Sequence, residues 1–183
     1  MLNRTLLVKA RADGPFAICV FEGREFACVV GRNGVVAAAE KREGDGKTPL
    51  GAWPLVAGFY RPDRVKALGV CQQPLEADMG WCDAAGDALY NQMCEVGYGA
   101  SHEVLWHEDT AYDYIGVMDY NLEGAVGAEG RGLGSAIFLH VWRDGAVHTE
   151  GCVALKKADL EVVLGGGCVA VEVVLGSRFE ENL

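Results

Sequence analysis

One cysteine and two histidines share a short stretch of this chain. Residues 138–155 read FLHVWRDGAVHTEGCVAL and contain His140, His148 and Cys152. A cysteine attacks a carbonyl as its thiolate, so a catalytic cysteine needs a histidine that takes its proton and backbone N–H groups that stabilise the oxyanion. Gly151 lets the backbone approach a substrate closely. These residue types indicate nucleophilic catalysis, and the alternative is that Cys152 only fills space in an apolar core.

The surroundings of the two histidines favour His140 as the base. His140 is the only polar residue between Ile137 and Trp142, a run that predicts a strand holding the imidazole rigidly. Eleven residues separate His140 from Cys152 and include the turn signal Asp144-Gly145, so the chain can fold back and bring the two together. His148 is expected in an exposed loop. A histidine base also predicts alkylation of Cys152 well below the pH of about 8.5 at which a free cysteine titrates.

The remaining sequence predicts one mostly β domain over residues 1–183. FAICVF and REFACVVG flank Glu22-Gly23 as a hairpin, and RTLLVKA, YDYIGVMDYN and CVAVEVVLG read as further strands. KKADLEVVLGGG predicts a short helix because its apolar residues recur at helical spacing. We expect loop and turn for KREGDGKTPLGAWPL, and long loops with one short helix for residues 61–110. The fold class is α+β, mostly β: a β-sandwich or closed mixed sheet with one or two short helices.

Composition excludes several classes of function. The formal net charge is −10 with no local Lys/Arg cluster, which argues against nucleic acid and anionic lipid as partners. No apolar run approaches the length of a membrane span, and the start, MLNRTLLVKARADG, lacks the apolar stretch of a signal peptide. The sequence as it stands predicts a cytoplasmic protein; a leader already removed, or unconventional export, would place it in the periplasm or cell envelope. Seven scattered cysteines without a CxxC pair suit a reducing compartment and predict no zinc site.

Other motifs have competing interpretations. A strand, not a helix, follows GAEGRGLGS, which argues against a nucleotide cradle. His102 and His107 lie five apart, whereas helical metal ligands usually lie four apart, so a solvated polar segment is favoured over a metal site. Trp81, Tyr90 and Asn91 suit the wall of a glycopeptide cleft, while the alternatives are a core position for Trp81 and a turn for Asn91. The Lys47–Pro49 segment is expected to shape a turn.

Several stretches of the chain resemble a known family. IFLHVW followed by HTEGCVAL resembles the signature of the L,D-transpeptidase catalytic domain, the YkuD-like family, in which a His precedes a Ser/Thr-His-Gly-Cys motif. KREGDGKTPLGAW is similar to the family's Lys-Thr-Pro-x-Gly segment, and GWCDAAGDALYNQ and GLGSAIFLHV resemble a short bacterial subgroup. The resemblance runs from Val29 to Leu164. It implies that Cys152 is the nucleophile, His140 its base, and Thr149 and Gly151 the matching motif positions.

This resemblance implies acyl transfer on peptidoglycan stem peptides. The thiolate would attack the carbonyl of the diamino acid at stem position three, expel the terminal D-alanine and form a thioester, without metal or organic cofactor. An amine of a second stem, another amine or water would then take the acyl group. The implied partner is a peptidoglycan stem peptide or a soluble muropeptide. The alternatives are an L,D-carboxypeptidase or amidase acting on the same bond, or a non-catalytic module that binds peptidoglycan or protein.

The sequence departs from the family pattern in three ways. Glu150 stands where most members have a second histidine, and Ala154 where many have an Arg that could hold a carboxylate. The gap from His140 to Cys152 is also shorter than in typical members. If Glu150 points inward, we expect it to tune the imidazole or bind the amine acceptor. The alternative to an exposed loop position for His148 is that it replaces the missing histidine in space. The residues expected to bind substrate are Thr149, Glu150, Gly151, Trp81 and Asn91.

Overall fold

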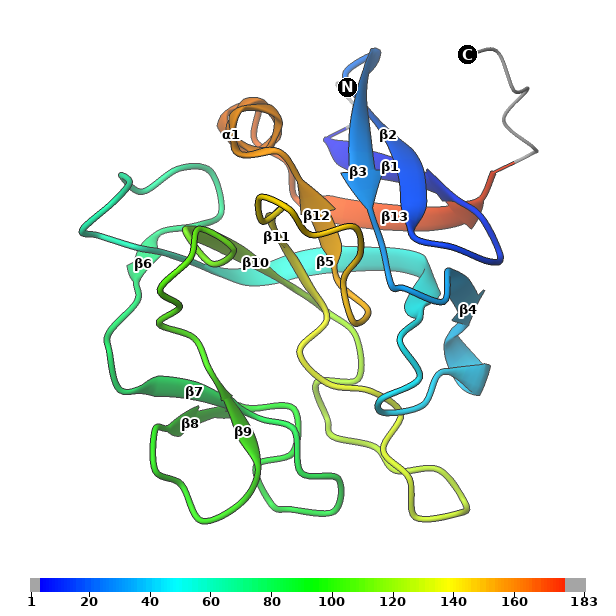
Figure 1. Ribbon diagram of the computed structural model, residues 1–183, viewed down its shortest axis with the longest axis vertical. Coiled ribbons are helices and arrows are strands. Elements are labelled where there is room, and N and C mark those ends of the chain that lie inside the picture. The colour runs from blue at the N-terminus through cyan, green and yellow to red at the C-terminus, as the bar shows by residue number, and fades with distance from the viewer. Residues whose placement is uncertain (1–3, 177–183) are drawn as a thin grey trace.

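The computed structural model describes residues 4–176, and its main feature is a closed mixed sheet (Figure 1). Eight strands of the described residues form a ring in the order β10-β11-β12-β3-β2-β1-β13-β5, and β5 pairs with β10 to close it. Their bounds are β1 Thr5–Ala10, β2 Phe16–Phe21, β3 Arg24–Val29, β5 Thr48–Tyr60, β10 Tyr114–Met118, β11 Phe138–Val141, β12 Val153–Leu155 and β13 Ala170–Leu175. The prediction of a mostly β, closed mixed sheet is therefore confirmed.

Smaller elements are attached to this ring. The short strands β4 (Val35–Ala37) and β6 (Gln73–Pro74) pair with β5, and η1 (Ala38–Glu40) is a 3-10 turn. A separate sheet has the order β8-β7-β9, from Met93–Glu95, Met79–Cys82 and His102–Val104, and lies far from α1 in Figure 1. The predicted short helix is α1, Lys157–Gly165, which buries Leu160, Val163 and Leu164. None of the described helices is long and apolar enough to cross a membrane.

Alternation of apolar residues explains the ring's core. β1 buries every second residue, namely Leu6, Val8 and Ala10, and β13 buries Val171 and Val173 in the same cluster. Because successive strand side chains point to opposite faces, this pattern directs one face of each strand to the inside. The predicted hairpin is also confirmed, since β2 and β3 pair antiparallel around the Glu22-Gly23 turn.

Two expectations about the middle of the chain are wrong. The second half of KREGDGKTPLGAWPL is not loop, because β5 begins at Thr48 and runs for 13 residues. Its prolines lie where β5 pairs with one neighbour each, Pro49 with β4 and Pro54 with β13, so the missing N–H interrupts no second ladder. Residues 61–110 contain no helix among the described elements, and instead supply β6 and the small sheet. Strands of two to four residues are too short to give a readable period.

The pairing of β11 with β12 positions the predicted catalytic residues. The two strands are parallel, with His140 opposite Ala154, and Cys152 lies directly before β12. A crossover through residues 142–152 connects them, and it turns at Gly145, which has a φ of +75°. The turn signal at Asp144-Gly145 is thus confirmed, and the two residues arrive at one edge of a cavity from neighbouring strands.

Candidate active site

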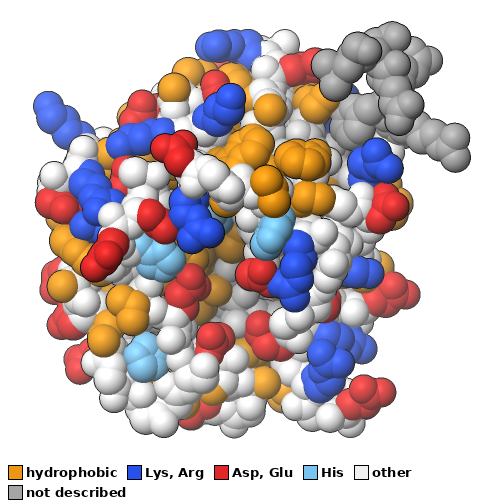
Figure 2. Space-filling view, in the orientation of Figure 1, with side chains coloured by type: hydrophobic (Ala, Val, Ile, Leu, Met, Phe, Trp, Pro, Cys, Tyr) orange, Lys and Arg blue, Asp and Glu red, His pale blue; other side chains and the backbone are white. Residues whose placement is uncertain are grey.

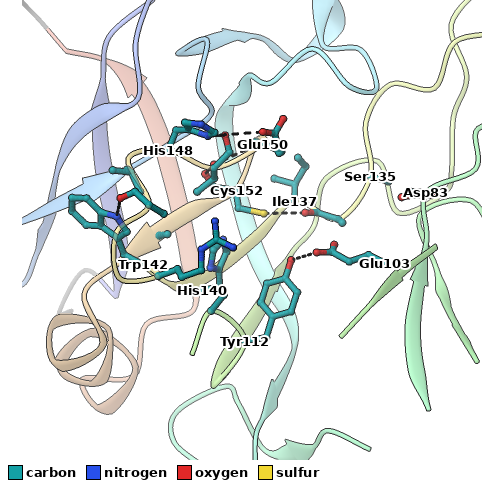
Figure 3. A pocket seen from close by; sticks show the side chains of 18 of the residues that line it. Asp83, Glu103, Tyr112, Ser135, Ile137, His140, Trp142, His148, Glu150 and Cys152 are labelled. Carbon is teal, nitrogen blue, oxygen red and sulfur yellow. Dashed lines mark hydrogen bonds and ion pairs between the residues drawn. The ribbon is translucent and has the colours of Figure 1, made fainter. Parts of the chain in front are cut away.

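A cavity of about 530 Å³ lies between the closed sheet and the small sheet, and both His140 and Cys152 line it (Figure 3). The ring contributes these two residues and the crossover, while the small sheet contributes Glu103 of β9. Charged side chains of both signs and histidine side chains are spread over the face of the molecule in Figure 2. Among the described residues, no group of three or more His, Cys, Asp or Glu is arranged to hold a metal ion.

Cys152 is buried as a neutral thiol. Its S–H donates to the Ala136 carbonyl at 3.1 Å, and its sulfur accepts the Phe138 N–H at 3.4 Å. Burial raises the pKa of Cys152 to about 12, because a thiolate loses its hydration there. Burial thus acts against the expected reaction of the thiol below the pH of a free cysteine, and that expectation stays a prediction. Any thiolate must form during the reaction.

His140 has the tautomer that a general base requires. Its Nδ1 lies 2.9 Å from the carbonyl oxygen of Val141, and since a carbonyl can only accept, Nδ1 carries the proton and Nε2 keeps its lone pair. Burial lowers the pKa of His140, which keeps the ring neutral at physiological pH. The ring of Tyr112 packs edge-on against it, with centroids 5.3 Å apart. Among the described hydrogen bonds, none joins the Cys152 sulfur to the His140 ring, so the proton is not shared between them in this structure.

Thr149 and Gly151 shape the backbone that carries the cysteine. The Thr149 hydroxyl donates to the Cys152 carbonyl at 2.7 Å and accepts the Gly151 N–H at 3.2 Å. Thr48 donates to the same carbonyl at 3.4 Å, which explains why a threonine follows Lys47. Gly151 has a φ of +152°, and a Cβ there would lie 3.0 Å from the Lys47 carbonyl oxygen. Both motif residues thus have contacts that fix the backbone, and direct contact with substrate stays a prediction.

Glu150 points away from His140 toward two other side chains. Its carboxylate forms an ion pair with Arg32 and lies 3.9 Å from His148 Nδ1 (Figure 3). Its side chain is 67% exposed, and that of His148 is 41% exposed, as expected for a loop residue. Ala154, at the family's arginine position, is buried on β12 and lines the cavity. A different arginine, Arg143 of the crossover, also lines the cavity.

Trp81 and Asn91 lie behind the cavity wall. Trp81 is in β7 and packs edge-on against Phe138, with ring centroids 5.1 Å apart. Its indole N–H donates to Asn91 Oδ1 at 2.9 Å, and both residues are buried. Neither is among the cavity-lining residues. Binding of substrate by this pair stays a prediction, and the contacts show a structural role.

The cavity also contains residues for which no catalytic role was predicted from the sequence. Tyr112 is buried and donates its hydroxyl to Glu103 Oε1 at 2.8 Å (Figure 3). Glu103 and Asp109 raise the pKa of His107, on the same wall. Lys41 is buried and donates to Asp45 at 2.7 Å. The stretch SHEVLWHED, interpreted from the sequence as a solvated polar segment rather than a metal site, thus supplies Glu103 and His107 to the cavity.

This arrangement defines a class of site: a buried thiol and a neutral imidazole on one cavity, able to carry out covalent catalysis at a carbonyl. Residues 20–165 match the model of the YkuD family, the L,D-transpeptidase catalytic domain. The match covers most of the chain, so the protein belongs to the YkuD family. Membership implies a peptidoglycan enzyme of the L,D-transpeptidase type. A comparison with curated proteins found no match.

Proposed function

We propose that the protein is a cysteine acyltransferase that acts on peptidoglycan stem peptides through a thioester at Cys152. The observation that carries the proposal is that one cavity is lined by both the Cys152 thiol and a neutral His140 whose Nδ1 donates to the Val141 carbonyl. No cofactor is needed for this chemistry, because the proton and the electron pair move only between thiol, imidazole and peptide.

The acylation step follows from the protonation states. As the sulfur attacks the carbonyl of the diamino acid at stem position three, the thiol proton passes to His140 Nε2, and the C–S bond forms. The imidazolium then gives this proton to the nitrogen of the terminal D-alanine, whose C–N bond breaks. Because burial disfavours both the thiolate and the imidazolium, the transfer is coupled to attack rather than preceding it.

The charge of the cavity supports an amine as acyl acceptor. Asp83 and Glu103 line it on one side of Cys152, and His148 and Trp142 lie on the other side (Figure 3). Asp83 Oδ1 is buried without a hydrogen-bond partner among the described residues. Carboxylates in such a position attract an ammonium group. The acceptor would first lose its ammonium proton to solvent. The free amine would then attack the thioester, its C–N bond forming as the C–S bond breaks, and its second proton would pass through His140 to the Cys152 thiol.

A stem tetrapeptide tests this proposal when it is incubated with and without an amine acceptor. We expect a covalent adduct on the intact protein and a new amide between tripeptide and acceptor. Free tripeptide as the sole product would show a hydrolase, an L,D-carboxypeptidase or amidase. If neither the peptide nor a carbapenem formed an adduct, the remaining interpretation would be a non-catalytic binding module. Cys152→Ala should abolish the adduct, whereas Cys94→Ala, which changes a cysteine of β8 outside the cavity lining, should retain it.

A further inference from the structure

Two consecutive residues behind the cavity wall hold the segment that faces Cys152. The Tyr90 hydroxyl accepts the N–H of Gly134 at 3.0 Å, and Asn91 Oδ1 accepts the N–H of Ala136 at 2.9 Å. Tyr90 in turn donates its own proton to Glu43 Oε2 at 2.6 Å. The segment from Gly134 to Ala136 is therefore fixed by side chains that come from a distant part of the chain.

Asn91 uses its entire hydrogen-bonding capacity. Besides Ala136, its oxygen accepts the Trp81 indole N–H at 2.9 Å, and its amide group donates to the carbonyls of Tyr120 at 3.0 Å and Asn121 at 2.7 Å. An asparagine side chain has two donors and an oxygen with two lone pairs, so no site is left over. The residue is 1% exposed. Its orientation is fixed from all sides.

Ala136 needs this support because its backbone is strained. Its φ is +51°, a left-handed conformation that non-glycine residues adopt only where the surroundings impose it. In this conformation its carbonyl accepts the Cys152 S–H at 3.1 Å. Two residues later, the Phe138 N–H donates to the same sulfur at 3.4 Å. The segment thus forms two hydrogen bonds with the sulfur, one through the Ala136 carbonyl as acceptor and one through the Phe138 N–H as donor.

We infer that Asn91, assisted by Tyr90, is a positioning residue for Cys152: it holds Ala136 in the left-handed conformation and so directs the Ala136 carbonyl at the sulfur. Asn91 acts through Ala136 and does not itself line the cavity. The effect of Asn91 on acylation rests on the proposed function, because it concerns the same sulfur. Its effect on the protonation of Cys152 does not.

The Ala136 carbonyl, held by Asn91, influences whether the Cys152 sulfur is protonated. The negative end of a carbonyl dipole stabilises a thiol relative to a thiolate. Burial is the largest cause of the raised pKa of Cys152, and Glu103 also favours the thiol, whereas the Phe138 N–H and Lys41 favour the thiolate. The titratable and charged residues that line the cavity with Cys152 are Lys41, Glu43, Asp83, Glu103, His107, Tyr112, His140, Arg143, His148 and Glu150. Asn91→Ala leaves all of them in place, so a changed titration would report the carbonyl.

The test is the pH dependence of iodoacetamide alkylation at Cys152, followed by peptide mass spectrometry. In Asn91→Ala, we expect Ala136 to relax, its carbonyl to turn away and the midpoint to fall by at least about one pH unit. Acylation by the stem tetrapeptide should become slower in the same variant, because the sulfur is no longer held. Local loosening that exposes the sulfur would also speed alkylation and slow acylation, so a matched core variant is measured beside Asn91→Ala.

Val8→Ala in β1 is the matched control, because it truncates the core away from the cavity and lowers stability alone. It should keep the wild-type midpoint. An unchanged midpoint in folded Asn91→Ala, or an equal fall in Val8→Ala at the same melting temperature, would overturn the inference. If Asn91→Ala does not fold, Tyr90→Phe should show a smaller fall, and no fall there would also overturn it. Absence of acylation in the wild type would refute the proposed function alone, since alkylation needs no substrate.

Discussion

The hydroxyl of Thr149 donates a hydrogen bond of 2.7 Å to the carbonyl of Cys152, across the turn that precedes β12. It also accepts the N–H of Gly151, so a single side chain fixes the backbone on both sides of the glycine. The threonine is buried, and both hydrogen bonds of its hydroxyl are to residues of the motif. The short motif before the cysteine therefore holds its own nucleophile in place.

Thr149→Val should destabilise the protein by about 1–3 kcal/mol, because the isosteric change leaves a buried carbonyl and a buried N–H without this partner. Urea unfolding measures the loss, and acylation should slow in parallel. Thr149→Ser keeps the hydroxyl and should restore both. If the hydroxyl acted only on substrate, Thr149→Val would raise KM and leave the free energy of unfolding unchanged, which would contradict the assignment.

Gly151→Ala should cost more than the same change at Gly145. Both glycines have positive φ, but a Cβ at Gly151 would lie 3.0 Å from the Lys47 carbonyl oxygen and 3.1 Å from Ile137 Cδ1, whereas one at Gly145 meets nothing within 4 Å. Gly145→Ala therefore adds only backbone strain, about 1 kcal/mol, and Gly151→Ala adds two tight contacts to which the neighbouring atoms must yield. Thermal unfolding compares the two variants. Equal losses would show that the close approach is not what requires glycine.

His140→Gln should slow acylation of Cys152 by about 10²–10⁴-fold, the usual contribution of a general base. His148→Gln is the control, because that histidine lies in the exposed part of the crossover. It should change the rate by less than about threefold, which is under 1 kcal/mol. The time course of the adduct on the intact protein gives both rates. A larger effect at His148 would reverse the assignment of the base.

Glu150→Gln should change stability by less than about 1 kcal/mol, because the ion pair with Arg32 is exposed to solvent and screened. Denaturant unfolding at low and high salt would measure this. Acylation should be nearly unchanged, since the carboxylate points away from His140. A strong loss of transfer to the amine, with acylation intact, would instead assign the carboxylate to the acceptor.

Stability should decline in alkaline solution. Burial raises the pKa of Cys152 and of Cys71 to about 12, above the value of about 8.5 in the unfolded chain. A group whose pKa is raised on folding stabilises the protein fully below its unfolded pKa, and this stabilisation is lost as the pH rises from about 8.5 toward 12. Each such group contributes a slope of up to about 1.4 kcal/mol per pH unit. Urea unfolding at successive pH values should show it, with a shallower decline in Cys71→Ala.

The parts of the fold that were predictable have a local cause. The β2–β3 hairpin and α1 follow from alternation, a turn and helical spacing, and His140 stands out because its neighbours in the strand are apolar. β5 was missed because its prolines read as loop, and only the pairing partners reveal that they are tolerated. The position of Asn91 depends on contacts with Trp81, Tyr120 and Ala136, which no local pattern encodes. The neutral thiol of Cys152 likewise depends on burial by distant segments.

The parallel pairing of β1 with β13 has a consequence for synthesis of the chain. Thr5 pairs with Ala170 and Ala10 with Leu175. The first strand of the ring in the sequence can therefore complete its pairing only after the last strand has been synthesised. While the ribosome is still translating residues before 170, the sheet has an unpaired edge at β1 and cannot close. We therefore expect the ring to form after these residues emerge, with Cys152 less shielded from oxidants and electrophiles in the nascent chain than in the finished one.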